Sequence, residues 1–231
     1  MMSNFLKRAI ASSVCLAALL SLASAQTAGT QQQNNNAAPP PKKNERPAGG
    51  ATVREPFESA TVEKMAAQCV KLETEAGEIE MEMLPETAPE TVRNFLNLAA
   101  MGAYDGTNFH RIVKGFIIQG GSFSTRMPVT LEYAKRMART IPDEPNLVKH
   151  LRGIVSMARS DKPNTATSSF FILVGDGPHL DGTFAAFGRV TRGLEVADAI
   201  NAAPAEAEKP SKPVQVKRAI VAPCPPHAPP Q

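Results

Sequence analysis

Hydrophobic and charged residues alternate along two neighbouring segments of the chain, residues 70–74 and 79–83. Such alternation is typical of strands with one buried and one solvated face, and the Glu-Ala-Gly sequence between the runs is a turn signal. In the second run the apolar positions alternate with Glu78, Glu80 and Glu82. We therefore predict a β-hairpin in which these three carboxylates form the solvated face.

Helical spacing of apolar residues begins directly after this hairpin. Thr87 and Glu90 match a capping box, a proline suits the first turn between them, and Gly102 ends the pattern. A second helix is predicted from Gly193 to about residue 202. Apolar residues at helical spacing also occur between residues 127 and 140, where the chain has no glycine.

Short runs rich in β-branched and aromatic residues make up most of the remaining pattern. The predicted strands span residues 112–119, 154–158, 170–174, 185–190 and 214–221. Many short strands with turn signals and only two clear helices favour a mainly β fold. We expect an antiparallel barrel whose ends are closed by helices.

The N-terminus has the three parts of a secretory signal peptide. Lys7 and Arg8 precede an apolar stretch at residues 9–22, and small residues follow up to Ala25. We predict a signal peptide at residues 1–25, cleavage between Ala25 and Gln26, and a periplasmic or secreted protein. The alternative is a membrane anchor, but the apolar stretch is shorter than the ~20 residues that a spanning helix needs. We therefore expect no stable membrane insertion.

Composition divides the rest of the chain into three parts. Residues 26–62 are rich in Gln, Asn and Pro, which predicts a disordered linker. Residues 63–223 carry the strand and helix patterns and form the predicted folded domain. Residues 224–231 are a proline-rich tail.

The overall charge is small and argues against nucleic acid as a partner. The chain has 231 residues, of which 20% are charged and 42% hydrophobic, as in ordinary globular proteins. Its formal net charge is +3, and loss of the signal peptide removes Lys7 and Arg8 and no acidic residue, which leaves +1. A nearly neutral protein lacks the basic surface that nucleic acid or anionic membranes attract.

Export would leave two cysteines, Cys69 and Cys224, one near each end of the folded region. A disulfide between them is possible in an oxidising compartment and would close a loop of about 155 residues. The alternative is two free thiols.

The most informative chemistry lies in the segment from Phe109 to Gly121. It places the permanently charged Arg111, the amide of Gln119 and the ring of Phe116 on one short strand-like run. No acid/base pair, nucleophile turn or metal-ligand spacing accompanies them, so hydrolysis finds no support, and no metal or cofactor is expected. A cation, an amide and apolar surface could bind a peptide and redistribute electrons in its amide. The alternative is structural: an arginine on a barrel rim, a glutamine bonded to backbone and a core phenylalanine.

Several further motifs, in order along the chain, resemble those of the cyclophilins, the cyclophilin-type peptidyl-prolyl cis-trans isomerases. Besides Phe109 to Gly121, they are Ser156-Met157-Ala158, Pro163-Asn164-Thr165, Ser168 with Phe170 to Ile172, Leu180-Asp181-Gly182 and Phe187-Gly188. The resemblance covers residues 69 to 221, and its Arg at 159 is shared with many bacterial members. It implies a closed eight-stranded antiparallel barrel capped by two helices.

The resemblance also assigns a peptide-binding groove. Arg111 corresponds to the catalytic arginine, and Gln119 joins it as a group that meets the substrate backbone. The substrate-binding positions that the resemblance implies are Phe116, Ile117, Ala158, Arg159, Ser169, Phe171, His179, Leu180 and Phe184.

Three of these positions depart from the usual family pattern, and at one of them Arg159 replaces the small amide often found there. Ser169 stands where members usually have glutamine, which would remove or shorten one hydrogen bond to the substrate. His179 stands where the best-known eukaryotic members have the tryptophan associated with high-affinity cyclosporin binding. None of these changes alters the catalytic arginine.

The resemblance therefore implies a peptidyl-prolyl cis-trans isomerase that accelerates X-Pro isomerisation during folding of exported proteins. Its expected partners are proline-containing peptides and unfolded exported proteins, and we expect a monomer. The alternative function is a proline-peptide-binding chaperone or scaffold with little turnover, which Ser169 could permit.

Overall fold

The computed structural model of the protein describes residues 55–225. The predicted signal peptide at residues 1–25, most of the predicted linker and tail residues 226–231 lie outside this range. Among the described residues, no helix has the length and apolar character needed to cross a membrane.

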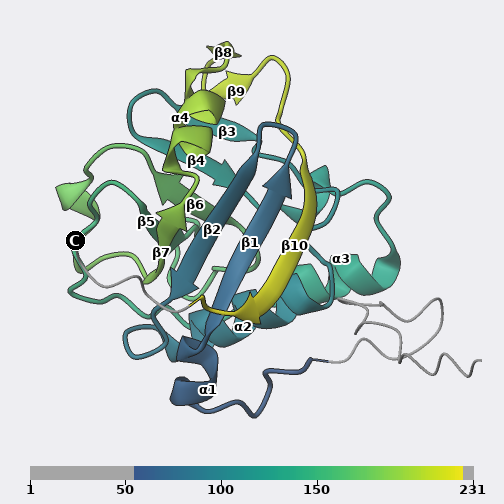
Figure 1. The fold of residues 1–231 in the computed structure, drawn as a ribbon, viewed down its shortest axis with the longest axis vertical. Helices are drawn as coiled ribbons and strands as arrows, with labels where there is room; N and C mark the ends of the chain where they lie inside the picture. Colours follow the sequence, from purple (N-terminus) through teal and green to yellow (C-terminus); the bar gives the residue numbers. More distant parts are fainter. Residues whose placement is uncertain (1–54, 226–231) are drawn as a thin grey trace, which may run out of the picture. The chain divides into compact units, whose positions relative to one another are not determined.

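The fold is built on one antiparallel sheet of eight strands (Figure 1). In chain order these strands are β1 (Gln68–Thr74), β2 (Glu78–Met83), β3 (Arg111–Val113), β4 (Ile117–Gly120), β5 (Ile154–Met157), β6 (Phe170–Leu173), β7 (Ala186–Arg192) and β10 (Val216–Pro223). Their order across the sheet is β10-β1-β2-β7-β5-β6-β4-β3. Two further short strands, β8 (Ala205–Glu206) and β9 (Lys209–Pro210), form a separate hairpin. The mainly β prediction is confirmed.

The predicted closed barrel is wrong, because the sheet is strongly curled but open. β3 and β10 are its two edges and do not pair with each other. The reason lies partly in the edge strand β3, where the Ile112 amide donates to the Glu208 carbonyl of the β8–β9 hairpin over 2.7 Å. The segment before β3 contacts the start of β10, where the Phe109 amide donates to the Val214 carbonyl and the Val216 amide donates to the Thr107 carbonyl.

One predicted strand is in fact two. The run at residues 112–119 is interrupted by a turn at Lys114 and Gly115, and β3 and β4 pair antiparallel on either side of it. Gly115 has a φ of +67°, the left-handed region that glycine adopts most readily. Every other residue of the run suits a strand, so a single glycine was too weak a signal to divide it.

Four α-helices lie among the described residues. They are α1 (Val62–Ala66), α2 (Pro89–Ala100), α3 (Leu131–Met137) and α4 (Leu194–Ala202), with short 3-10 turns η1 (Phe123–Thr125) and η2 (Pro178–Leu180). The two predicted helices correspond to α2 and α4. α3 falls inside the segment at residues 127–140 whose helical spacing was noted.

The predicted capping box of α2 is wrong. The Thr87 hydroxyl donates to the carbonyls of Leu84 and Ala186, so it does not cap the helix. The first amides of α2 donate instead to the carboxylate of Glu144, over 3.0 Å from Glu90 N and 2.7 Å from Thr91 N. An acidic group at this end stabilises a helix whichever part of the chain supplies it.

The predicted linker extends too far, because residues 55–62 are folded against the domain. Phe57 is buried, and its amide donates to the Asn97 side chain of α2 over 2.8 Å. Arg93 of α2 donates to the carbonyls of Phe57 and Ala60. The side chains of Arg93 and Asn97 on α2 thus fix a segment whose own composition gives little indication of order.

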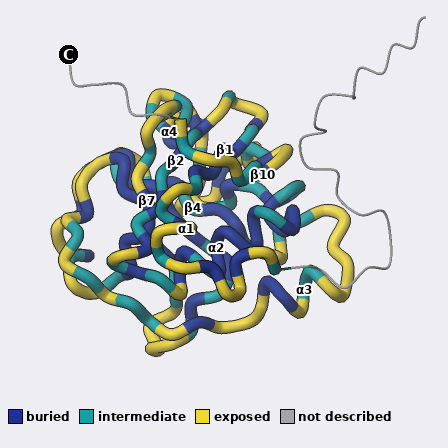
Figure 2. The backbone as a smooth tube through the Cα atoms, turned by 60° about the horizontal axis from the view of Figure 1, so that its bottom comes forward, coloured by how far each residue is buried: buried dark blue, intermediate teal, exposed yellow. Residues whose placement is uncertain are grey.

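The main hydrophobic core lies between the curled sheet and α2 (Figure 2). Phe95 of α2 is its centre, with ring centroids 5.1 Å from Tyr104, 5.3 Å from Phe170 and 4.9 Å from Phe187. All four rings are fully or almost fully buried. Aromatic rings bury large areas and pack edge to face, so this cluster fixes α2 against β6, β7 and the turn that follows the helix.

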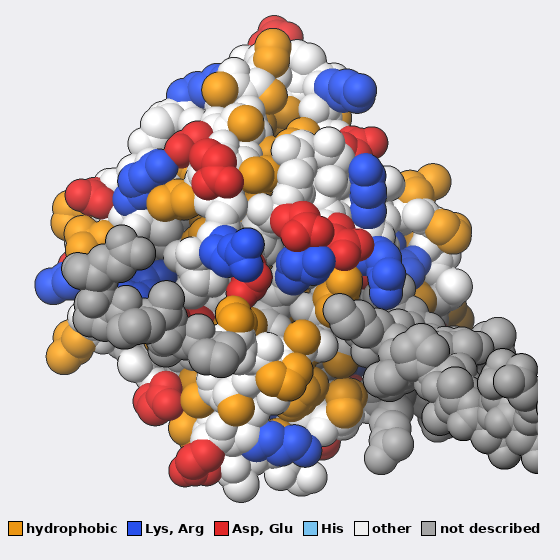
Figure 3. All heavy atoms as spheres, in the orientation of Figure 1, with side chains coloured by type: hydrophobic (Ala, Val, Ile, Leu, Met, Phe, Trp, Pro, Cys, Tyr) orange, Lys and Arg blue, Asp and Glu red, His pale blue; other side chains and the backbone are white. Residues whose placement is uncertain are grey.

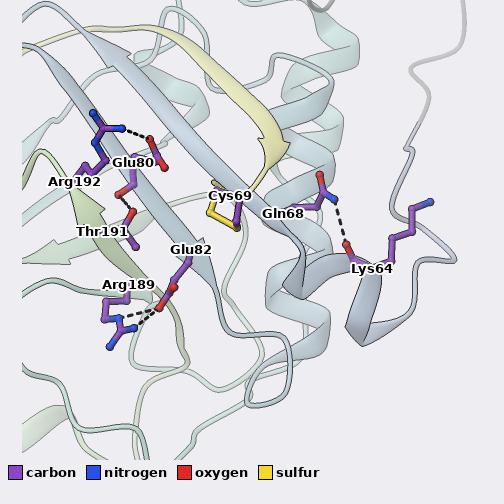
Figure 4. Close-up of a disulfide and its surroundings, with 9 residues drawn as sticks. Lys64, Gln68, Cys69, Glu80, Glu82, Arg189, Thr191 and Arg192 are labelled. Carbon is purple, nitrogen blue, oxygen red and sulfur yellow. Dashed lines mark hydrogen bonds and ion pairs between the residues drawn. A yellow bond between two sulfur atoms is a disulfide. The ribbon is translucent and has the colours of Figure 1, made fainter. Parts of the chain in front are cut away.

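A disulfide joins Cys69 at the start of β1 to Cys224 just after β10 (Figure 4). The face of the sheet beside it carries acidic and basic side chains next to one another (Figure 3). Here the glutamate face expected to be solvated is largely paired: Glu82 lies 2.6 Å from Arg189 Nη2 and Glu80 lies 3.9 Å from Arg192.

Candidate active site

A second, smaller hydrophobic cluster contains most of the predicted groove residues. Its buried members include Ile117, Phe171 and Leu180, and the partly buried Phe116, Ala158 and Phe184 pack against them. The Phe171 and Phe184 rings meet edge to face, with centroids 5.9 Å apart. The structure thus brings six predicted positions from four separate segments into one apolar cluster.

Three neighbouring strands place the polar groups beside this surface. Arg111 on β3 is paired in register with Gln119 on β4, which is paired in turn with Phe171 on β6. In addition, Arg111 Nη1 donates to Gln119 Oε1 over 3.1 Å. The guanidinium, the amide and the apolar ring therefore lie in one row across the sheet.

The turn that presents Phe116 is held by Asn201, near the C-terminal end of α4. Its Nδ2 donates to the carbonyls of Val113 and Ile117, over 2.8 and 2.9 Å, and its Oδ1 accepts from Gly115 N over 2.8 Å. Sequence reasoning missed this residue. An asparagine inside a helix has no local signal for a contact with a turn 84 to 88 residues earlier.

The electrostatic environment of Arg111 includes a second residue that sequence reasoning missed. Arg111 Nε lies 2.7 Å from Glu208 Oε2, an ion pair between the edge strand β3 and the β8–β9 hairpin. The two side chains are 44% and 48% exposed, so the guanidinium stands at the molecular surface and remains accessible. Glu208 lies in a segment with no recognisable motif, and no pattern linked it to Arg111.

The remaining predicted positions lie around the apolar surface. The Ala158 amide donates to the Ser169 carbonyl over 2.9 Å, which ties the end of β5 to the start of β6. The Arg159 guanidinium lies 5.0 Å over the Phe184 ring, and its Nη2 donates to the Thr183 carbonyl over 3.3 Å.

His179 is exposed, and its ring lies 5.3 Å from that of Phe116, with the two planes inclined by 37°. The position where tryptophan was expected in other members therefore still places a flat ring against the groove.

Two histidines near the site, the buried His150 and the half-buried His110, do not provide acid/base chemistry. Burial lowers the pKa of His110, and the neighbouring Arg111 charge acts in the same direction. Burial also lowers the pKa of His150, although Asp181 opposes the shift. His150 stands between Asp181 and Ser156, at 3.2 Å from each, an order that resembles an acid-base-nucleophile arrangement. Ser156 is fully buried and donates to the Ala185 carbonyl, so no substrate reaches it.

Within residues 55–225 no cluster of three or more His, Cys, Asp or Glu side chains could hold a metal ion. The groove therefore offers a fixed cation, an amide and an apolar surface. Such a site can bind an apolar ring and stabilise a change in charge distribution beside it.

Comparison with known proteins agrees with this chemistry. Residues 69–221 match the family model of the cyclophilin type peptidyl-prolyl cis-trans isomerase/CLD. The chain belongs to this family, and its enzymatic class is peptidyl-prolyl cis-trans isomerase. Peptidyl-prolyl cis-trans isomerase A of Dickeya dadantii is 39% identical over 165 residues, which are 66% of this chain and 83% of that protein. Peptidyl-prolyl cis-trans isomerase CYP18-1 of Arabidopsis thaliana is 44% identical over 130 residues, 56% of this chain and 79% of that protein.

Solved structures show the same fold. The crystal structure of a cyclophilin type peptidyl-prolyl cis-trans isomerase of Cryptosporidium parvum matches with a TM-score of 0.59 and 32% identity, covering 68% of this chain and 99% of that one. A second structure of that protein was determined in the presence of the dipeptide Ala-Pro, and it matches with the same TM-score and identity over 67% and 98% of the two chains. The resemblance to cyclophilins is thereby confirmed.

Proposed function

We propose that this protein accelerates cis-trans isomerisation of X-Pro bonds in exported polypeptides, and that Arg111 is its catalytic residue. The observation that carries the proposal is the row formed by Arg111, Gln119 and Phe171 across β3, β4 and β6. This row sets a permanent cation at the edge of a surface that fits a proline ring.

The barrier to be lowered comes from the partial double bond of the imide and is roughly 18–20 kcal/mol. In the twisted transition state the proline nitrogen regains its lone pair, which the planar ground state delocalises. A donor directed at that nitrogen stabilises the twisted form more than the planar one, and only such differential binding increases the rate. An acceleration of five to six decades corresponds to about 7–8 kcal/mol, shared among the guanidinium, desolvation and anchoring of the ring.

The apolar cluster supplies the anchor in this mechanism. Phe116, Ile117, Phe171 and Leu180 hold the proline ring, while Gln119 and the Ala158 backbone meet the substrate main chain. His179 and Phe184 extend this anchor, because their rings pack against Phe116 and Phe171, and Arg159 and Ser169 lie beside it. No step transfers a proton, because arginine stays charged throughout the physiological range. We expect no sharp bell-shaped pH dependence of the rate.

The proposed site of action is the periplasm or the extracellular space. The predicted signal peptide supports export, and the Cys69–Cys224 disulfide supports an oxidising compartment, where such bonds persist. The proposed clients are unfolded exported proteins, and the proposed active form is a monomer that resembles bacterial members of the family.

The test is an isomerisation assay of the purified protein on a short Ala-Pro peptide. Arg111→Ala should reduce kcat/KM about 10²- to 10³-fold, the usual effect of removing one directed donor from a transition state. Arg111→Lys keeps the charge but loses the planar fork, and should recover only a small part of the activity. Arg218→Ala, at an exposed arginine on β10, is the matched control and should act as wild type.

The Arg111→Ala and Arg111→Lys variants must keep the wild-type circular dichroism spectrum. Full activity of folded Arg111→Ala would remove this residue from the mechanism. Binding of the peptide by the wild-type protein without turnover would favour the alternative, a proline-peptide-binding chaperone or scaffold.

A further inference from the structure

The β8–β9 hairpin has a tip whose backbone is unusual for its sequence. Ala205 pairs with Pro210 and Glu206 with Lys209, so Ala207 and Glu208 form a two-residue turn. Their φ values are +46° and +66°, in the left-handed region that usually favours glycine or asparagine. Strain of this kind is found at functional sites more often than elsewhere, which suggests a functional role for the Glu208 side chain at the tip.

Glu208 contacts β3 through both its backbone and its side chain. Its carbonyl accepts from Ile112 N over 2.7 Å, and its Oε2 accepts from Arg111 Nε over 2.7 Å. A glycine at this position would relieve the turn and keep the backbone contact. Only a residue with a long acidic side chain also reaches the guanidinium. The glutamate at this strained position therefore provides an ion pair with Arg111 that the hairpin itself does not need.

The consequence falls on the orientation of Arg111. A guanidinium has five N–H groups in one plane. Glu208 Oε2 accepts a hydrogen bond from Nε over 2.7 Å, and Gln119 Oε1 accepts one from Nη1 over 3.1 Å. Two contacts within the plane, at two different nitrogens, fix its rotation, and the other N–H groups of Nη1 and Nη2 stay available to a substrate.

The Glu208 carboxylate orients the Arg111 guanidinium and also offsets part of its positive charge. The relative size of these two effects decides whether the contact raises or lowers the rate of isomerisation. Both side chains are nearly half exposed, at 44% and 48%, so water screens the offset charge. The direction of an N–H group toward a developing lone pair is not screened in this way. Holding the long arginine side chain before the reaction also removes rotamer freedom that would otherwise be lost during it.

We propose that Glu208 is a positioning residue for the isomerase reaction, which holds the Arg111 guanidinium in the plane that meets the twisted imide. The inference rests on the proposed role of Arg111.

The experiment compares Glu208→Gly with wild type on an uncharged Ala-Pro peptide. We expect kcat/KM to fall about two- to fivefold, the range of an exposed ion pair, with the loss in kcat and little change in KM. The thermal midpoint should stay equal or rise, because glycine suits the left-handed turn. A merely structural role would lower stability and activity together, so a loss of activity without a loss of stability identifies positioning. Glu206→Gln, on the same hairpin and equal in charge change, should match wild type.

Two further measurements complete the test. Raising NaCl from 0.1 to 1 M shortens the screening length from about 10 to 3 Å, so the advantage of wild type over Glu208→Gly should shrink. Adding Glu208→Gly to Arg111→Ala should cause no further loss, because the glutamate acts through the arginine.

Equal or higher activity of Glu208→Gly would overturn the inference while leaving Arg111 in place, provided that Arg111→Ala is inactive. Full activity of Arg111→Ala would instead reject the proposed catalytic role of Arg111, so the two failures are distinguishable.

Discussion

His150 shows how one buried side chain can make the fold sensitive to acid. Its side chain is fully buried, its backbone amide donates to Asp181 Oδ1 over 2.8 Å, and its ring spans from Asp181 to Ser156. Burial disfavours the charged imidazolium and lowers its pKa below the ordinary value of 6.5. Donation from the His150 amide and contact with Lys149 lower the pKa of Asp181 to about 2, so the carboxylate stays charged well into acid.

We predict that the free energy of unfolding decreases as the pH falls from 7.5 to 5.5. Below pH 6.5 the unfolded chain binds a proton at His150 that the folded protein resists, and His110 acts in the same direction. Each histidine contributes at most about 1.4 kcal/mol per pH unit. Urea unfolding at the two pH values measures the difference, which should become smaller in His150→Gln. A wild-type difference of zero would contradict this account.

Residues in local motifs could be predicted, and residues recruited from a distance could not. Arg111, Phe116 and Gln119 share one recognisable segment, so their neighbourhood was readable from sequence. Asn201 and Glu208 reach that segment from 84 to 97 residues away, as an ordinary helix asparagine and an ordinary loop glutamate. Their roles depend on tertiary packing, which leaves no local pattern.

At the scale of elements, α3 and the N-terminal segment stabilise each other. Arg136 of α3 is 8% exposed and contacts both oxygens of Glu55, over 2.8 Å each. Its remaining terminal nitrogen donates to Asn94 of α2 over 2.8 Å. Burial raises the pKa of Glu55, but contacts with Arg136 and Arg139 outweigh this and lower it overall. A charge this deeply buried is stable only while its partner is present.

Glu55→Gln should therefore lower the free energy of unfolding by about 1–3 kcal/mol, the cost of leaving a buried polar contact unsatisfied. Glu58→Gln is the matched control, since Glu58 is 62% exposed and lies 4.0 Å from Arg139. An exposed pair of this kind contributes about 0–1 kcal/mol. Urea denaturation of both variants gives the comparison, and an equal effect of the two substitutions would show that the Arg136 contact carries no special weight.

The N-terminal end of a helix, like the site residues Asn201 and Glu208, depends on contacts between residues that are distant in sequence. The α2 cap could not be predicted, because Glu144 comes from 53 to 54 residues downstream while the local Thr87 is used elsewhere. The strands of the hairpin and the apolar faces of α2 and α4 could be predicted, because their periodicity is local. Hydrophobic pattern thus determines which elements form, and long-range polar contacts determine where they begin and how they join.

For the molecule as a whole, the open sheet makes the edge strand β10 the element most in need of support. Among the described residues β10 pairs only with β1 within the sheet, and its last residue, Pro223, pairs with Gln68 at the start of β1. The disulfide and the bond from the Cys224 amide to the Ala67 carbonyl, at 3.0 Å, fix that end. A closed barrel would hold β10 on both sides, so the opening explains why a covalent link matters here.

We predict that reduction of the disulfide destabilises the whole domain, because Cys69 and Cys224 are 155 residues apart. The link restricts the unfolded chain over almost its entire folded length, and loop entropy puts the effect at up to about 5 kcal/mol. Urea unfolding with and without reductant measures it. The double variant Cys69→Ser, Cys224→Ser should have the same unfolding midpoint as the reduced wild type, and reductant should not change it. This comparison separates loss of the disulfide from other effects of the reagent. Because β10 lies at the edge opposite β3, the peptide assay at 25 °C should change little as long as the reduced domain stays folded. An unfolding midpoint that does not respond to reductant would show that strand pairing alone holds β10.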